Sequence, residues 1–365
     1  MMRGRLRAAL LTCVAGLLAG CVAVPPPGAA EEPARPGAPR TPLAQLTGLA
    51  DPRSHTGPTT AVVEQADITP VATDPRPALP ATVTDDQGAS VTVTDASRIL
   101  ALDVSGTLAA TVFGLGLGPN VVGRDVSTGF PAAQDLPLVT VNGHQLNAEA
   151  IVNLRPTVIL TDTTLGPWDA MLQLRDMGVP VVVVTHKRGM DTNAAIVHDV
   201  AAALGVPEQG RALADRMARE IAATTEAVSR LAPAEPDRKL RVVFLYLRGQ
   251  AGVYYLFGKG SGADSLITAL GAVDVATEVG IDGMRPVNPE ALTRAKPDVI
   301  LMMTKGLESV GGAEGALEVP GIAQTPAGER RRFVDMSDHQ VLGFGPLTAS
   351  VLDGLARALY APEGS

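Results

Sequence analysis

The sequence predicts an α/β fold in which two Rossmann-like lobes are joined by one long backbone helix and enclose a ligand cleft. Short β-branched runs alternate with helical stretches in both halves of the chain, as in mostly parallel sheets. An amphipathic stretch of helical period, residues 207–231, separates the two halves. A pattern that starts at Asn147 recurs from Asn288, which indicates two related lobes.

Composition narrows the class of protein before any motif is read. Of the 365 residues, 46% are hydrophobic and 19% are charged, which is enough apolar material for a packed core. Lys and Arg number 30 against 38 Asp and Glu, and the net charge of -8 argues against a nucleic-acid partner. With 2 Cys, the chain is neither a disulfide scaffold nor a cysteine-rich metal protein.

The first 21 residues are expected to form a lipoprotein signal peptide. Three arginines precede an apolar run over residues 8–19, which has signal-peptide length and is too short to span a bilayer. The ending Leu18-Ala19-Gly20-Cys21 resembles the bacterial lipobox, in which the cysteine is lipidated. A secretory signal with a chance cysteine is the plainer alternative. Lipidation of Cys21 would hold the protein at the extracytoplasmic face of the cell membrane.

The rest of the chain divides into a tether and a folded part. Residues 22–80 are predicted to be a disordered tether, because Pro and Ala are abundant and no regular period persists. The N-terminal α/β lobe is expected over 81–206, the inter-lobe helix over 207–233 and the C-terminal α/β lobe over 234–360. The periodic stretch of the inter-lobe helix, residues 207–231, would extend about 37 Å at 1.5 Å per residue.

Local patterns predict the elements of each lobe. Alternating Val and Thr around an Asp-Asp-Gln-Gly turn predict a hairpin over 81–95. Further strands are expected at 98–103, 121–125, 157–162, 179–185, 239–249, 253–258, 296–303 and 331–336. Helices are expected at 105–118, 168–178, 265–270 and 346–360.

The internal repeat supports the two-lobed prediction. Asn-x-Glu-Ala at 147–150 recurs at 288–291, and Arg-Pro-x-Val-Ile-Leu at 155–160 recurs as Lys-Pro-x-Val-Ile-Leu at 296–301. Helix–Pro–strand units look alike in many α/β proteins, but the shared spacing favours homologous lobes. Open α/β sheets bind ligands beyond the carboxyl ends of their strands, so the cleft between the lobes is the expected site.

Common catalytic motifs are missing from the chain. It contains neither H-E-x-x-H nor G-x-S-x-G, and Gly258-Lys259 is followed by Gly260 where a P-loop needs Ser or Thr. Gly258, Gly260 and Ala263 fit a loose dinucleotide-binding pattern, but a glycine turn between strand and helix has many causes. We therefore expect a protein that is not an enzyme.

Several stretches of the chain resemble a known family, and NGHQLNAEAI and FLYLRG are the ones most specific to it. Others, such as SGTLAATVFGLGLGPNVVGRD, VNPEALTRAKPDVILMM and LEVPGIAQTPAGERRRFVDM, are shared with a wider superfamily. Together they resemble the substrate-binding lipoproteins of bacterial ABC importers for heme, relatives of the cobalamin- and siderophore-binding proteins. The resemblance covers about Val83 to Leu359.

The resemblance implies that His144 and Tyr246 are the axial ligands of a heme iron, one from each lobe. His144 lies in a loop just before the helix expected at Asn147, and Tyr246 ends an apolar strand. A phenolate suits ferric iron, and imidazole supports either oxidation state. A free phenol has a reference pKa of about 10, so Arg248, on the same strand face, is predicted to donate to the phenolate oxygen. The alternative is a hydrated strand-end tyrosine beside a surface arginine.

Two further sets of residues are predicted to take part. Glu149 and Glu290 occupy matching repeat positions, and the resemblance implies that they pair with arginines of the permease; the helix dipole alone also favours a glutamate there. Candidate cleft-lining residues, some of which would receive the heme propionates, are Arg124, Ser127, Tyr255, Lys259, Ser261 and His339.

The resemblance implies a monomeric, lipid-anchored, extracytoplasmic receptor. It would carry heme b, as a transported ligand, to an ABC permease and its ATPase. The nearest alternative is a ferric-siderophore or cobalamin carrier of the same fold, which needs no axial pair. A more distant alternative is an anchored heme-handling oxidase, which would need an open coordination position on the iron.

Overall fold

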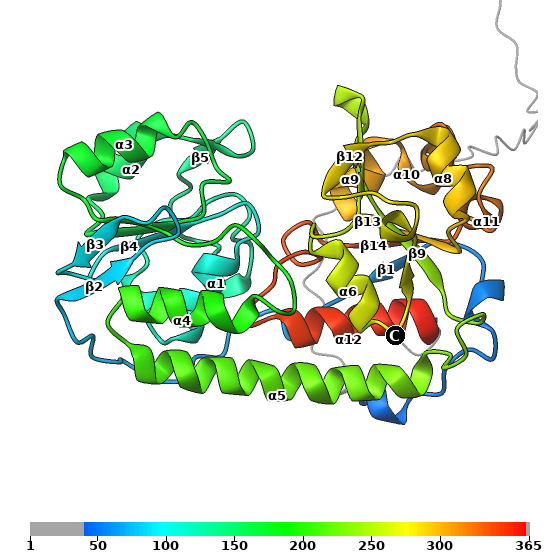
Figure 1. Ribbon diagram of the computed structural model, residues 1–365, viewed down its shortest axis with the longest axis horizontal. Helices are drawn as coiled ribbons and strands as arrows, with labels where there is room; N and C mark the ends of the chain where they lie inside the picture. Colours follow the sequence, from blue (N-terminus) through cyan, green and yellow to red (C-terminus); the bar gives the residue numbers. More distant parts are fainter. Residues whose placement is uncertain (1–39, 363–365) are drawn as a thin grey trace, which may run out of the picture. The chain divides into compact units, whose positions relative to one another are not determined.

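The computed structural model describes residues 40–362, and these form two α/β lobes (Figure 1). The predicted fold class is therefore confirmed. The expected signal peptide and the lipidation site Cys21 lie outside the described residues. Within the described part of the chain, no helix is both long enough and apolar enough to cross a membrane.

The N-terminal lobe is built around a three-stranded parallel sheet in the order β4-β7-β8. Alternate residues of β4 face opposite sides, so Ile99 and Ala101 join one buried cluster while Leu100 and Leu102 join another. Helices cover both faces. The elements of this lobe are β2 Ala81–Thr84, β3 Ser90–Val93, β4 Ile99–Leu102, α1 Thr107–Gly114, β5 Thr140–Val141, β6 Gln145–Leu146, α2 Ala148–Leu154, β7 Val158–Thr161, α3 Asp169–Asp176, β8 Val181–Val183 and α4 Asn193–Ala203.

The C-terminal lobe contains a seven-stranded sheet in the order β1-β14-β13-β9-β10-β12, with β11 also paired to β9. Strands β10 and β12 form the two antiparallel pairings of this sheet, whereas its other four pairings are parallel, so the sheet is mixed but still mostly parallel. Its strands are β1 Thr59–Ala61, β9 Arg241–Arg248, β10 Val253–Phe257, β11 Val273–Asp274, β12 Met284–Pro286, β13 Val299–Met303 and β14 Phe333–Met336. Its helices are α6 Ala263–Ala269, α7 Val275–Glu278, α8 Pro289–Ala295, α9 Thr304–Ser309, α10 Gly312–Leu317, α11 Pro326–Glu329 and α12 Thr348–Tyr360.

Helix α5, Pro207–Leu231, links the lobes and runs beneath both of them in Figure 1. Its first half buries Leu213 and Met217 in the core of the N-terminal lobe, whereas its second half buries Val228 and Leu231 in the core of the C-terminal lobe. At Gly210 the helix approaches α4 so closely that an added Cβ would lie 2.5 Å from the Cβ of Ala201. The helix is thus part of both hydrophobic cores.

The predicted disordered tether is wrong over residues 40–80. Strand β1 pairs in parallel with β14 at the edge of the large sheet, and Ile68 is buried in the core of the N-terminal lobe. The segment therefore begins on one lobe and continues onto the other. The prediction failed because the apolar residues of this segment are sparse, lie among prolines and show no regular period. A short strand such as β1 is enough to cover an exposed sheet edge, and it leaves little trace in the sequence. Single-turn helices complete the described elements, namely Leu43–Gln45, Pro52–Ser54, Gly118–Asn120, Pro131–Ala133 and Gly249–Ala251.

The sequence repeat has the same geometry in both lobes. Asn147 and Asn288 cap helices α2 and α8 with their side-chain oxygens, which accept backbone N–H groups of the first turn. Arg155 and Lys296 end those helices in the left-handed conformation, with φ of 46° and 48°. Buried parallel strands, β7 and β13, follow. Equivalent caps at both ends of the unit explain why these positions recur.

Candidate functional site

A cavity of about 640 Å³ lies between the two lobes, within the range typical of small-molecule sites. Residues from the loops after β4 and before β5, and from the β5–β6 hairpin, form one wall. Residues of β9, β10, β12 and β13 and of the loop after β14 form the other. The lining is mainly apolar, and it includes Val104, Val126, Phe257, Met284, Met303 and Leu342.

His144 lies at the tip of the β5–β6 hairpin and lines this cavity. The preceding Asn142 and Gly143 both have positive φ, 48° and 86°, and an Asn-Gly pair is favoured at such hairpin turns. The tip is exposed. Desolvation and the positive charge of Arg248 lower the pKa of His144 from its usual value. This shift favours the neutral imidazole, which has a lone pair available for a metal.

Tyr246 lines the opposite wall from the middle of the large sheet. It belongs to β9 and lies directly opposite Tyr255 on β10. Its ring is stacked on that of Phe257, with the ring centroids 6.1 Å apart. Paired strands on both sides and an aromatic neighbour fix the position of the ring, and its half-buried phenol belongs to the cavity lining.

Arg248 is held beside Tyr246 in a different way from the predicted one. Its guanidinium carbon lies 4.5 Å from the centroid of the Tyr246 ring, over the ring face, where a cation is attracted by the π-electrons. Its Nη2 donates to Asp338 Oδ1 at 3.1 Å, and its Nη1 donates to the Leu247 carbonyl. The described contacts of Arg248 are thus with the ring face and with Asp338 rather than with the phenol oxygen.

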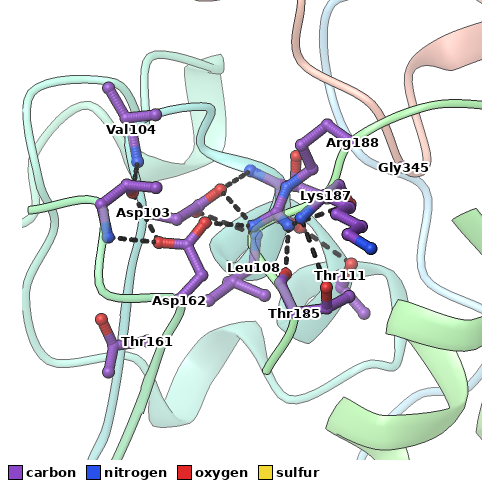
Figure 2. Close-up of polar contacts among 12 residues, drawn as sticks. Asp103, Val104, Leu108, Thr111, Thr161, Asp162, Thr185, Lys187, Arg188 and Gly345 are labelled. Atoms are coloured by element: carbon purple, nitrogen blue, oxygen red, sulfur yellow. Dashed lines mark hydrogen bonds and ion pairs between the residues drawn. The ribbon is translucent and has the colours of Figure 1, made fainter. Parts of the chain in front are cut away.

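Buried ionic groups lie next to the cavity-lining residue Val104 in the N-terminal lobe, and Figure 2 shows their polar contacts. Arg188 Nη2 donates to Asp103 Oδ2 at 3.1 Å and to Asp162 Oδ2 at 2.6 Å. Asp103 accepts backbone N–H groups at the start of α1, and Asp125 accepts that of the lining residue Ser127. Burial, together with the negative charge of Asp103, raises the pKa of Asp125 to about 7.

The residues predicted to line the cleft divide into two groups. Ser127, Tyr255 and His339 line the cavity. Arg124, Lys259 and Ser261 are outside the lining formed by the described residues. Arg124 donates to the backbone carbonyls of its own loop, Lys259 is exposed in the β10–α6 turn, and the Ser261 hydroxyl donates to the Gly258 carbonyl at 2.6 Å. These three residues are close to lining residues in the sequence, but local backbone hydrogen bonds and the direction of the turn keep their side chains out of the lining.

Sequence reasoning missed Lys305 and Asp338, which also line the cavity. Lys305 follows the carboxyl end of β13, and Asp338 follows that of β14. Ligands of α/β sheets bind at the carboxyl ends of the strands. The position of both residues just after apolar strands could therefore have identified them as candidate lining residues. Asp338 Oδ2 accepts the backbone N–H of Lys305 at 3.1 Å, and its Oδ1 accepts from Arg248.

Glu149 and Glu290 lie outside the cavity. Both are exposed and occupy the first turns of α2 and α8. In residues 40–362, no group of three or more His, Cys, Asp or Glu side chains is arranged to hold a metal ion by itself.

Comparison with solved structures gives extensive matches. The heme binding protein HmuT is 43% identical over 86% of this chain and 100% of its own, with a TM-score of 0.81. Alanine variants of its histidine, tyrosine and arginine have also been solved. RhuT from Roseiflexus sp. RS-1, a periplasmic heme-binding protein, is 36% identical over 73% of this chain and 99% of its own (TM-score 0.66). BhuT in complex with two hemes is 32% identical over 73% and 98% (TM-score 0.63). No curated protein matches the chain.

The fold and the cavity define a two-lobed α/β binding protein that holds a ligand between its lobes. The family model described as periplasmic binding protein matches residues 103–339. The chain belongs to the periplasmic binding protein family, whose members bind substrates for transport.

Proposed function

We propose that this protein is an extracytoplasmic heme receptor that delivers heme to an ABC importer. The observation that carries the proposal is that His144 and Tyr246, from different lobes, line one cavity. An imidazole and a phenolate on opposite faces of a porphyrin complete six-coordinate ferric iron. Heme b is the proposed ligand, because His144 and Tyr246 would hold it through its iron, without a covalent bond between the porphyrin and the protein.

The comparisons support the same assignment. HmuT, RhuT and BhuT are named as heme-binding proteins. In HmuT, the substituted tyrosine and arginine stand two positions apart, as Tyr246 and Arg248 do here. Tyr246 and His144 are therefore the proposed ligands, and Arg248 is proposed to stabilise the anionic phenolate through its charge above the ring.

The protein would act as a carrier and would break no bond of the heme. Lipidation of Cys21 would tether it, as a monomer, to the outer face of the cell membrane. The capped starts of α2 and α8 would then present Glu149 and Glu290 to the permease. Both glutamates are exposed, one on each lobe, and each follows an asparagine cap of the same geometry.

Docking and binding can be separated by experiment. Replacing both Glu149 and Glu290 by Ala should leave hemin affinity unchanged, because neither residue lines the cavity. Heme uptake by cells that carry the importer should fall at least tenfold. The exposed pair Glu226 and Glu235, replaced in the same way, is the matched control. Normal uptake with the double variant would rule out the docking role.

The ferric-siderophore or cobalamin alternative has a direct optical test. Purified protein should bind one equivalent of hemin and show a shifted Soret band together with a phenolate-to-iron charge-transfer band. The same preparation should not bind a ferric siderophore or cobalamin. Binding of either of these ligands, with no spectral change on addition of hemin, would replace the heme assignment.

A further inference from the structure

Lys305 stands out among the charged residues of the cavity. It follows β13 in helix α9, its backbone is fixed by Asp338, and its exposed side chain lines the cavity. Among residues 40–362, no carboxylate forms a described ion pair with its ammonium group. An uncompensated cation at a ligand cavity is suited to an anionic part of the ligand.

The other cations near the cleft already have partners or lie elsewhere. Arg248 is paired with Asp338 and covers the Tyr246 ring. Arg124 donates to carbonyls of its own loop, and Lys259 is outside the lining. The pairing of Arg248 with Asp338 also cancels those two charges, so Lys305 supplies the remaining charge of the wall.

His339, which also lines the cavity, does not add to this charge. Burial lowers its pKa, and the charge of Lys305 lowers it further, against a smaller opposing effect of Asp338. The imidazole of His339 is therefore not the cation that a carboxylate would meet at pH 7.

We infer that Lys305 binds a propionate carboxylate of the heme at the mouth of the cavity, and that it selects for porphyrins with free acid groups. The inference rests on the proposed function. Ferric porphyrin carries one positive charge, which a tyrosinate ligand neutralises, so the two propionates carry the charge of the bound complex. Carboxylates remain at the water-exposed end of a site, because burying an unpaired charge is costly. An exposed lysine reaches that end.

The test compares hemin with its dimethyl ester, in which both carboxylates are neutral. We expect Lys305→Met to weaken hemin binding by roughly tenfold or more, as for loss of a hydrogen bond between charged groups. Affinity for the dimethyl ester should change less than twofold. Lys305→Arg should keep most of the hemin affinity, and Lys259→Met, which removes an exposed lysine outside the lining, should bind both ligands like wild type.

Added salt provides a second measurement. Hemin affinity of the wild type should fall between 50 mM and 500 mM salt, and Lys305→Met should show a flatter dependence. Equal losses for hemin and for the ester, or no loss for either, would overturn the role of Lys305. Failure of wild-type protein to bind hemin at all would instead overturn the proposed function.

Discussion

The two proposed iron ligands are presented by very different pieces of structure. Tyr246 belongs to an eight-residue strand with neighbours on both sides, and its ring is stacked on Phe257. His144 lies at the exposed tip of a hairpin whose strands have two residues each. One lobe would thus supply its ligand from a fixed strand, and the other from a small, solvent-exposed element.

This difference teaches how a binding protein can capture and also release its cargo. A ligand fixed by a sheet needs little reorganisation when the iron arrives, which favours binding. A ligand on a short hairpin has fewer contacts to break when it moves away. We therefore expect Tyr246 to dominate affinity and His144 to control how readily heme leaves.

The largest expected effect comes from removing the phenol oxygen. Tyr246→Phe keeps the ring on Phe257 and beneath Arg248, so the fold of the wall should be retained. Hemin affinity should fall by more than the roughly 10- to 100-fold that follows loss of an outer-shell partner. The charge-transfer band should vanish. Tyr255→Phe, on the paired strand, is the control and should keep the band. A band that survives Tyr246→Phe would contradict the assignment.

Removing the histidine should have a smaller effect on affinity and a larger one on release. His144→Ala should weaken hemin binding by about 10-fold and speed its transfer to apomyoglobin by a larger factor. The charge-transfer band should persist, because the phenolate remains. His198→Ala, an exposed histidine on α4, should behave like wild type. An affinity loss equal to that of Tyr246→Phe would remove the distinction between the two ligands.

Arg248 tests whether a charge above the ring matters. Arg248→Ala should lower hemin affinity by about 5- to 10-fold and raise the pH at which the charge-transfer band appears, because the phenolate loses a nearby cation. Arg248→Lys should restore only part of this effect, since an ammonium group lacks the planar guanidinium that lies on the ring. A band with the same pH dependence in Arg248→Ala and wild type would exclude the stabilising role.

The smallest expected effect concerns the ionic cluster behind the N-terminal wall. The pKa of Asp125 is raised to about 7 in the folded protein, so the native state binds a proton more tightly than the unfolded chain does. This group therefore makes the free energy of unfolding increase as pH falls from about 7 to 4. Asp125→Asn should flatten that increase in urea titrations, whereas Asp135→Asn, an exposed residue nearby, should not. An unchanged slope would mean that Asp125 is charged throughout.

Much of the fold could be read from the sequence, because its signals are local. The limits of α5 and the caps at Asn147 and Asn288 depend on periodicity and on side chains a few residues away. The packing of residues 40–80 could not be predicted, since β1 is defined by its partner β14, far along the chain. The antiparallel β10 and β12 likewise depend on pairing rather than on composition.

The candidate site was only partly predictable for the same reason. His144, Tyr246 and Arg248 lie in distinctive stretches, and all three line the cavity. The direction of the Arg248 guanidinium depends on Asp338, which comes from another strand end. Lys259 and Lys305 both follow strands, and only tertiary structure distinguishes the lysine that lines the cavity from the one that does not.

The central claim is that one iron is bound by both lobes at once, and the structure of the hemin-loaded protein tests it most directly. The account predicts iron within coordination distance of a His144 ring nitrogen and of Tyr246 Oη, on opposite faces of the porphyrin. Iron bound by another pair of residues, or by a single side chain and water, would contradict it.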